Sequence, residues 1–244
     1  MNKKSSEAES LKKFILESDD FYLKYHANRY KQLINFIAEN YSAQKKVLDI
    51  GNSTFAQIVS QIFQCQVDEL GFSKDSKKPF GHQYQFNLND CHDESKWRTD
   101  IGKYDLIIFA EVIEHLYTSP VQVLSYLHSI LQEKGKIILQ TPNATVLHKR
   151  IQLLLGKNPY MLIRENVFNP GHFREYTKAE LIEYANTCGF TVDKVSYGNY
   201  FDYQYTFAQS KGGEVKSYLK IINLIYSILP SSLKPGITMI LSKG

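Results

Sequence analysis

The sequence predicts an α/β fold with a doubly wound, seven-stranded and mostly parallel sheet that ends in an antiparallel strand. Short apolar runs alternate along the chain with segments of helical periodicity, which is typical of strand–helix–strand units with right-handed crossovers. The run from Tyr104 to Ala110 is almost continuously apolar, as in a central parallel strand that is covered on both faces. The length of 244 residues is close to the upper size for one hydrophobic core, so we expect a single domain over residues 1–244.

Four parts follow one another within this expected domain. Residues 1–42 form a helical extension, because the apolar residues between Phe21 and Ile37 recur near helical spacing. The other three parts are a ligand-binding strand–helix core, an insertion on the substrate side and the C-terminal half of the sheet, at residues 43–143, 144–176 and 177–244.

The expected strands are short apolar runs bounded by polar or turn residues. They are Lys46–Ile50, Cys65–Leu70, Tyr84–Leu88, Tyr104–Ala110, Lys136–Gln140, Phe190–Ser196 and Gly236–Leu241. Three helix starts have the capping-box pattern, at Thr54 with Gln57, at Ser119 with Gln122 and at Thr177 with Glu180. The last two strands are expected to close the sheet as an antiparallel pair.

Five of the expected strands are followed by polar residues. The polar ends are Asp49–Ser53, Glu69–Gly71, Asn87–Asn89, Ala110–Glu114 and Thr141–Asn143. In a doubly wound sheet, ligands bind beyond the carboxyl ends of the strands, where the strand order reverses. The sequence therefore predicts a ligand site at this edge of the sheet.

Charge and cysteine content narrow the class of protein and partner. The 29 Lys and Arg residues exceed the 25 Asp and Glu residues by only four, without the clustered basic face typical of nucleic-acid binding. Three widely spaced cysteines, Cys65, Cys91 and Cys188, give neither a disulfide framework nor metal-ligand spacing. The longest apolar stretch, Ile221 to Leu229, is too short to span a bilayer, and the polar N-terminus has no apolar signal region. We expect a cytoplasmic protein without a transmembrane segment.

Motifs between about Val47 and Val195 carry a family resemblance. Val47 to Ser53 (VLDIGNS) places an acid and a glycine in the turn after a strand, and Tyr104 to Leu116 reads YDLIIFAEVIEHL. Three later motifs follow in order, at Leu127–Asn143, Gly171–Leu181 and Cys188–Phe190. In order and spacing they resemble the Rossmann-like, class I S-adenosylmethionine-dependent methyltransferases, nearest to the small-molecule, quinone and glycan O-methyltransferases. The resemblance implies that fold, S-adenosylmethionine as the cofactor, and methyl transfer.

The resemblance also implies which residues bind the cofactor. They are Asp49, Gly51, Asn52, Ser53, Glu69, Leu70, Asn87, Leu88, Ala110 and Glu111. Asp49 and the turn after it would hold the amino-acid end of the cofactor, and Asn87 would accept a bond from the adenine amine. The acid that usually binds the ribose falls at Gly71 here, so Glu69 is expected to serve in its place.

The first turn departs from the family pattern at two positions. Ser53 and Phe55 stand where a second and a third glycine are usual, and those glycines let the backbone approach the cofactor. The departures leave open a catalytically degenerate protein of this fold that binds without turnover. The turn also lacks the G-x-G-x-x-G fingerprint, which argues against a nicotinamide oxidoreductase.

His115 is the expected general base, because imidazole titrates near neutrality, and Glu111 and His172 complete the predicted catalytic set. Glu111, Glu114 and His115 are spaced i, i+3 and i+4, so a helical turn would bring them to one face. With His172 they resemble the metal-binding set of the small-RNA 3′-terminal 2′-O-methyltransferases. A metal-dependent RNA 2′-O-methyltransferase is therefore the alternative, although the absence of a basic stripe argues against it. We expect no metal.

The insertion is the expected acceptor pocket, because loops over a rigid sheet commonly carry substrate contacts. Its candidate acceptor contacts are Tyr160, Arg164, Phe168, His172, Arg174 and Tyr176. These residue types suit a polar or aromatic acceptor, and we expect in-line O-methylation of a small molecule or a cell-envelope glycan. The apolar segment Ser217 to Leu229 is expected in the core or at a homodimer face, with a lid or a membrane-surface contact as alternatives.

Overall fold

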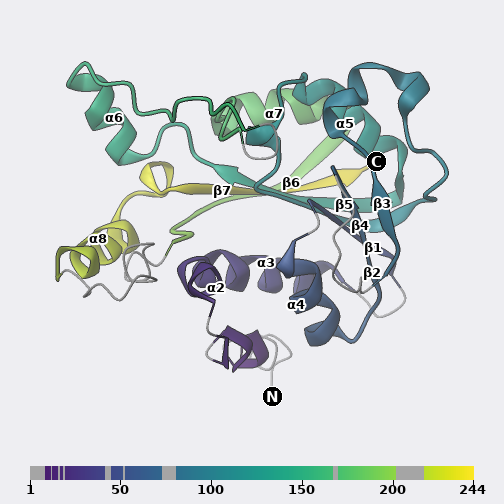
Figure 1. The fold of residues 1–244 in the computed structure, drawn as a ribbon, viewed down its shortest axis with the longest axis horizontal. Coiled ribbons are helices and arrows are strands. Elements are labelled where there is room, and N and C mark those ends of the chain that lie inside the picture. The colour runs from purple at the N-terminus through teal and green to yellow at the C-terminus, as the bar shows by residue number, and fades with distance from the viewer. Residues whose placement is uncertain are drawn as a thin grey trace.

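The computed structural model describes residues 9–11, 13–15, 17–18, 20–41, 45–51, 53–72, 81–166, 170–201 and 217–244. The predicted contacts Asn52 and Phe168 lie outside these residues. Seven strands form one sheet in the order β3-β2-β1-β4-β5-β7-β6 (Figure 1). They are β1 (Val47–Ile50), β2 (Val67–Gly71), β3 (Gln83–Gln85), β4 (Tyr104–Ala110), β5 (Leu131–Pro142), β6 (Phe190–Gly198) and β7 (Gly236–Lys243).

The strand directions confirm the predicted fold class. Strands β1 to β5 pair in parallel, whereas β7 runs antiparallel to both of its neighbours, β5 and β6. The strand order reverses between β1 and β4, since the chain builds outward from β1 in one direction and then from β4 in the other. This reversal fixes the switch point at which a ligand is expected.

Helices cover both faces of the sheet. They are α2 (Phe21–Tyr25), α3 (Ala27–Asn40), α4 (Thr54–Phe63), α5 (Pro120–Ser129), α6 (Leu147–Leu154), α7 (Lys178–Thr187) and α8 (Ser217–Ile228). Figure 1 shows α3 and α4 on one face and α5 and α7 on the other, with α6 and α8 at the same end of the molecule. None of the helices in the described ranges combines the length and the apolar character that crossing a membrane requires.

Alternation along the central strands divides the core between the two faces. On β4, Leu106 and Ile108 pack with α3 and α4, whereas Ile107 and Phe109 pack with α5 and α7. All four side chains are almost fully buried, which is why the strand reads as an unbroken apolar run. On β1 the same alternation places Asp49 on the face that carries α3.

Helix and strand boundaries follow local hydrogen bonding more closely than apolar periodicity. The predicted capping box at Thr177 is confirmed. The predicted cap at Thr54 is wrong by one residue, because Ser53 has the extended backbone and its Oγ accepts from the Phe55 N–H at 3.1 Å. The predicted strand Tyr84–Leu88 is too long, because Asn87 caps a short 3₁₀ helix that begins at Leu88.

The insertion leaves the sheet and returns to it at one contact. Asn143, directly after β5, forms an isolated parallel bridge with Tyr176, and the Ala144 N–H donates to the Tyr176 carbonyl at 3.1 Å. Asn143 Nδ2 also donates to the carbonyls of Ser232 and Lys234, each at 2.9 Å. The segment between α8 and β7 and both ends of the insertion are therefore fixed to the same strand end.

Replacing Thr177 by Ala should lower the free energy of unfolding by about 1 kcal/mol, because it removes the side-chain acceptor for the Glu180 N–H. The matched control is Thr187→Ala in the last turn of the same helix, where the hydroxyl donates to an exposed carbonyl and the change should stay within about 0.5 kcal/mol. Urea unfolding measures both. Equal losses in the two variants would contradict a specific role for the cap.

Candidate active site

Two adjoining cavities lie at the carboxyl ends of β1, β2 and β4. The larger has a volume of about 590 Å³ and the smaller about 310 Å³. Ile50, Gly51, Glu111 and Val112 line both cavities, so the turns after β1 and β4 form their common wall. The predicted ligand edge and the observed cavities therefore coincide.

The smaller cavity combines a buried carboxyl group with a buried guanidinium group. Asp49 is 2% exposed, and its carboxylate accepts a hydrogen bond from Ser53 Oγ at 2.8 Å. Burial raises the pKa of Asp49 to about 7, although the bonds from Ser53 oppose the shift. Arg29 of α3 lies across the same cavity, with Tyr22 and Tyr30 beside it.

The turn after β1 requires a glycine at Gly51. Its φ is +114°, and a Cβ built there would lie 3.3 Å from Val112 Cγ2. Any side chain would be strained and would also press on the wall between the two cavities. The glycine of this sequence motif is therefore required for local steric reasons.

Neither departure from the glycine pattern lines the larger cavity. Ser53 caps α4 and bonds to Asp49, while the Phe55 ring is buried and stacks on Tyr30 with 5.1 Å between ring centroids. Ser53 and Phe55 contribute to the wall of the smaller cavity, which stays open between them and Arg29. Where the family pattern has glycines, Ser53 provides a helix cap and Phe55 an aromatic contact.

Glu111 joins the two cavities and has an unusual backbone. Its φ of +57° is left-handed, which is uncommon outside glycine and clusters at functional sites. Glu111 Oε2 lies 3.5 Å from Arg29 Nη1, while Oε1 is buried and has no hydrogen-bond partner among the described residues. Burial raises the pKa of Glu111, and Arg29 opposes that shift.

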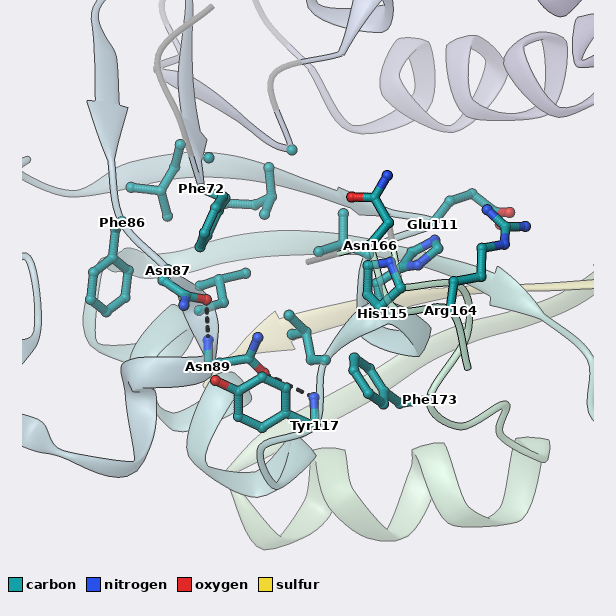
Figure 2. Close-up of a pocket in the computed structure, with 18 of the residues that line it drawn as sticks. Phe72, Phe86, Asn87, Asn89, Glu111, His115, Tyr117, Arg164, Asn166 and Phe173 are labelled. Atoms are coloured by element: carbon teal, nitrogen blue, oxygen red, sulfur yellow. Dashed lines mark hydrogen bonds between the residues drawn. The ribbon is translucent and has the colours of Figure 1, made fainter. Parts of the chain in front are cut away.

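The larger cavity is mostly apolar with a few amide groups (Figure 2). Phe72 and Phe86 follow β2 and β3, and Asn87 lies next to them. Asn87 Oδ1 already accepts from the Asn89 N–H at 3.0 Å, so only its second lone pair and its NH₂ group remain for a ligand. Asn89 Oδ1 accepts from the Tyr117 N–H at 2.8 Å, which holds the loop after β4 against the cavity.

Most of the predicted cofactor contacts lie on these walls, with one clear exception. Asp49, Ser53 and Ala110 line the smaller cavity, and Leu70, Asn87 and Leu88 line the larger; Gly51 and Glu111 line both. Glu69 lines neither cavity. Side chains alternate along β2, and the Glu69 side chain lies on one face of the sheet, where its carboxylate accepts a hydrogen bond from Gln83 Nε2 at 2.9 Å. Its placement gives no support to the predicted ribose contact.

Two histidines and a glutamate meet beside the larger cavity. The predicted helical turn exists as a 3₁₀ turn, Ile113–His115, and it brings Glu114 and His115 together with His172. The rings of His115 and His172 meet edge-on with centroids 4.8 Å apart. Ligand atoms of these three residues lie within 4.8 Å of one another, but Glu111 is outside the group because it pairs with Arg29. The predicted four-ligand set is therefore reduced to three.

Hydrogen bonds fix the orientation of both imidazoles. His115 Nδ1 donates to the Gly171 carbonyl at 2.8 Å, and His172 Nδ1 donates to Glu175 Oε1 at 3.0 Å. Glu175 also binds Lys149 of α6, and its pKa is held below the usual value. Burial lowers the pKa of His115, although the bond to Gly171 opposes the shift.

Of the predicted acceptor contacts, Arg164 lines the larger cavity, and His172 lies behind His115. Tyr160, Arg174 and Tyr176 line neither cavity. Arg174 is exposed and pairs with Glu180 of α7, and Tyr176 is buried against Tyr184. Tyr160 turns towards the Ala144 carbonyl and Lys149, so none of these three side chains is placed to bind an acceptor in the cavity.

Several wall residues were not predicted from the sequence. On the larger cavity they are Phe72, Phe86, Leu116, Tyr117, Ile163, Glu165, Asn166, Pro170 and Phe173. On the smaller cavity they include Arg29, Tyr22 and Tyr30. An arginine among the apolar positions of the helix Ala27–Asn40 was the available signal, because a buried charge requires a partner.

The pair of opposite charges in the smaller cavity fits the amino-acid end of S-adenosylmethionine. That end carries an ammonium and a carboxylate, which Asp49 and Arg29 can bind respectively. Glu111 Oε1 is a buried acceptor without a partner and lies where the two cavities meet. The apolar and aromatic walls of the larger cavity suit the adenosine part.

A Rossmann-like sheet with these cavities at its switch point defines the class I methyltransferase architecture. The sequence matches a family described as a methyltransferase domain over residues 22–195, which is more than half of the chain. The chain belongs to this methyltransferase family, and it is an S-adenosylmethionine-dependent methyltransferase. A search of curated proteins finds no relative that matches it.

Solved structures share the fold at low sequence identity. An S-adenosylmethionine-dependent methyltransferase from Archaeoglobus fulgidus has a TM-score of 0.56 at 16% identity, covering 88% of this chain and 93% of the other. A cyclopropane synthase from Mycobacterium tuberculosis has a TM-score of 0.55 at 14% identity, covering 97% and 98%. An S-adenosylmethionine-dependent methyltransferase from Clostridium acetobutylicum has a TM-score of 0.55 at 11% identity, covering 90% and 92%. At such identities the similarity shows a common fold.

Cofactor affinity should fall as the pH is lowered from 8 to 6. Because the pKa of Asp49 is raised to about 7, the carboxyl group is mostly ionised at pH 8 and mostly protonated at pH 6. Only the ionised form attracts the cofactor's ammonium, so the affinity should drop about tenfold over this range. Calorimetric titration with S-adenosylmethionine measures the change.

Asp49→Asn is the matched control for this pH dependence. The variant should bind more weakly than the parent at pH 8, by about tenfold or more, because a charge-assisted hydrogen bond is lost. Its affinity should be nearly independent of pH between 6 and 8. A variant that keeps the full pH dependence would assign the titration to another group.

Proposed function

We propose that this enzyme transfers the methyl group of S-adenosylmethionine to an oxygen of a small molecule or a cell-envelope glycan, with His115 as the general base. The observation that carries the proposal is the position of His115, which lines the larger cavity together with Glu111 (Figure 2). Its Nδ1 donates to Gly171, so the neutral ring presents an unprotonated Nε2. A base with a fixed tautomer at the edge of the cofactor cavity suits deprotonation of a hydroxyl.

The cofactor, when bound, supplies an activated methyl group on a sulfonium. The protein has to align the acceptor oxygen with that methyl carbon, and orientation alone can supply about 7–11 kcal/mol of the barrier. The lowered pKa of His115 keeps its imidazole neutral near pH 7, which is the form that accepts a proton. The side chain is 37% exposed, so the accepted proton can pass on to water.

The mouth of the larger cavity supports a polar acceptor with a flat or ring-shaped body. Tyr117 and Phe173 stand edge-on with centroids 5.6 Å apart, and both line the cavity. Arg164 and Asn166 lie across from them (Figure 2). Aromatic faces and hydrogen-bonding groups together are suited to sugars and phenols. They support a small-molecule or glycan acceptor.

His115→Gln should lower kcat by about 10²–10⁴-fold and leave the dissociation constant of S-adenosylmethionine nearly unchanged, because general-base catalysis contributes about this much. The matched control is His92→Gln, since His92 also bonds a backbone carbonyl through Nδ1 but lies outside both cavities. Steady-state methyl transfer to a panel of soluble phenols and glycans measures kcat. An equal kcat for the parent and His115→Gln would remove His115 from the mechanism.

A second candidate is metal-assisted methylation of an RNA 2′-hydroxyl. The cluster of Glu114, His115 and His172 favours it, because a mixed carboxylate and imidazole set suits a first-row divalent metal. Glu114 Oε1 is fully buried and lacks a hydrogen-bond partner among the described residues. In this mechanism His115 Nε2 would be a ligand and not a base.

Removal of metal separates the two candidates. For the leading proposal, dialysis against EDTA should leave the rate of methyl transfer unchanged. For the second, EDTA should abolish the rate, and Mn²⁺ or Mg²⁺ should restore it. Calorimetric titration of the cofactor-free protein with Mn²⁺ tests binding directly, and His172→Gln should then weaken it.

A further inference from the structure

The most exposed large hydrophobic side chains gather at one end of the molecule. In the described part of the chain, seven such side chains are more than 60% exposed, and six of them come from α6, the loop after it, and α8. These six define the apolar face: Leu154, Leu155, Leu162, Ile163, Leu224 and Ile228. The seventh, Tyr117, is at the mouth of the larger cavity. A concentration of this kind marks an interaction surface, because scattered single residues would need no explanation.

Contacts hold the two helices of the apolar face together. His148 of α6 bonds to the Tyr226 hydroxyl of α8 at 2.7 Å, and their rings meet edge-on. Figure 1 shows both helices at the same end of the molecule. Asn143 fixes the segment after α8 to the end of β5. The helices α6 and α8 therefore lie on either side of the sheet at one end of the molecule and are joined by the His148–Tyr226 contact.

Cations outnumber anions around the apolar face, where exposed Glu165 follows Arg164. Residues 144–164 and 217–234 contain no Asp or Glu, although the chain has 25 of them. Exposed cations flank the apolar side chains at Arg150, Lys157, Arg164 and Lys220. Apolar area with a cationic rim is complementary to an anionic lipid surface, where lipid tails and headgroups meet both components.

The same charge argues against a second copy of the chain as the occupant. A two-fold contact places a surface patch against itself, so the cationic rims of both copies would meet. The helices α6 and α8, with 8 and 12 residues, are too short to span a bilayer but long enough to lie in its interface. We propose that the apolar face binds the surface of an anionic lipid bilayer.

The apolar face continues into the larger cavity. Ile163 belongs to both, and Arg164, which follows it, also lines the cavity. A molecule anchored in the bilayer by an apolar tail could therefore place its polar head at His115 without leaving the membrane. This step rests on the proposed function, and it assigns the acceptor to the class of amphiphiles: lipid-anchored phenols or glycans. Binding to the bilayer itself is independent of the reaction.

Co-sedimentation of the full chain with vesicles tests the proposal. Vesicles of phosphatidylcholine mixed with phosphatidylglycerol should sediment the protein at low salt, and vesicles of phosphatidylcholine alone should do so much less. Leu154→Ser with Leu162→Ser should weaken binding by about tenfold or more, because both side chains are over 80% exposed and each loses apolar burial in the membrane. Because both side chains are exposed, the substitutions should leave the fold intact, and cofactor titration checks this.

A charge-matched pair isolates the electrostatic part. Lys157→Gln with Lys220→Gln should weaken binding to anionic vesicles by roughly 25-fold, since each cation near an anionic surface contributes about fivefold. Lys103→Gln with Lys178→Gln removes the same charge from exposed positions away from the apolar face and should have little effect. An equal loss in both pairs would reduce the effect to net charge and overturn the proposal.

Two further outcomes would also overturn it. No sedimentation with anionic vesicles would exclude the membrane, and a dimer in solution that the Leu154→Ser, Leu162→Ser variant dissociates would make the face a contact between copies. Neither outcome affects the test of His115, which uses soluble acceptors and no vesicles. Failure of the proposed function is thus seen in the rate of methyl transfer, and failure of the membrane proposal is seen in sedimentation alone.

Discussion

The ion pair between Arg29 and Glu111 is the interaction on which the active site depends. Burial raises the pKa of both Asp49 and Glu111, and Arg29 opposes the shift at each of them. Two buried carboxylates without a cation would be neutral or would keep the strand ends apart, because an unpaired buried charge is costly. Since Arg29 belongs to α3, the N-terminal helices complete the cofactor cavity and cannot be regarded as an appendage.

The fold could be predicted where one physical cause dominates a segment. Strand β4 is covered on both faces, and the capping box at Thr177 joins two side chains to two backbone groups, so each leaves a clear pattern. Strand β5 begins at Leu131, before the predicted Lys136, because the intervening polar residues are exposed and give no apolar signal. The start of α4 depends on which of two adjacent hydroxyl residues has the extended backbone, and residue type does not determine that.

The site could be predicted only where its residues follow strands that meet at one edge. Asp49 lies near the end of β1, Gly51 follows that strand, and His115 lies in the turn after β4, so the topology alone brings them to the cavities. Arg29 reaches the site because α3 packs against the sheet. The order of residues along the chain does not reveal that packing. The opposite error occurs at Arg174, whose residue type suits an acceptor but whose nearest partner, Glu180, lies on the following helix.

The state of Glu114 determines whether His115 and His172 act as metal ligands or His115 acts as a base. Its Oε2 accepts from Thr141 Oγ1 at 2.8 Å, while Oε1 lies 4.0 Å from His115 Nε2 and has no hydrogen bond among the described residues. A divalent cation would satisfy that oxygen, but so would a proton. Burial, with Glu111 adding to it, raises the pKa of Glu114 well above its ordinary value, so binding of either a proton or a cation would relieve the cost of a buried carboxylate. The choice of mechanism therefore depends on what binds Glu114 Oε1: with a proton there, His115 Nε2 keeps its lone pair and can act as a base, whereas with a cation there, His115 Nε2 becomes a ligand.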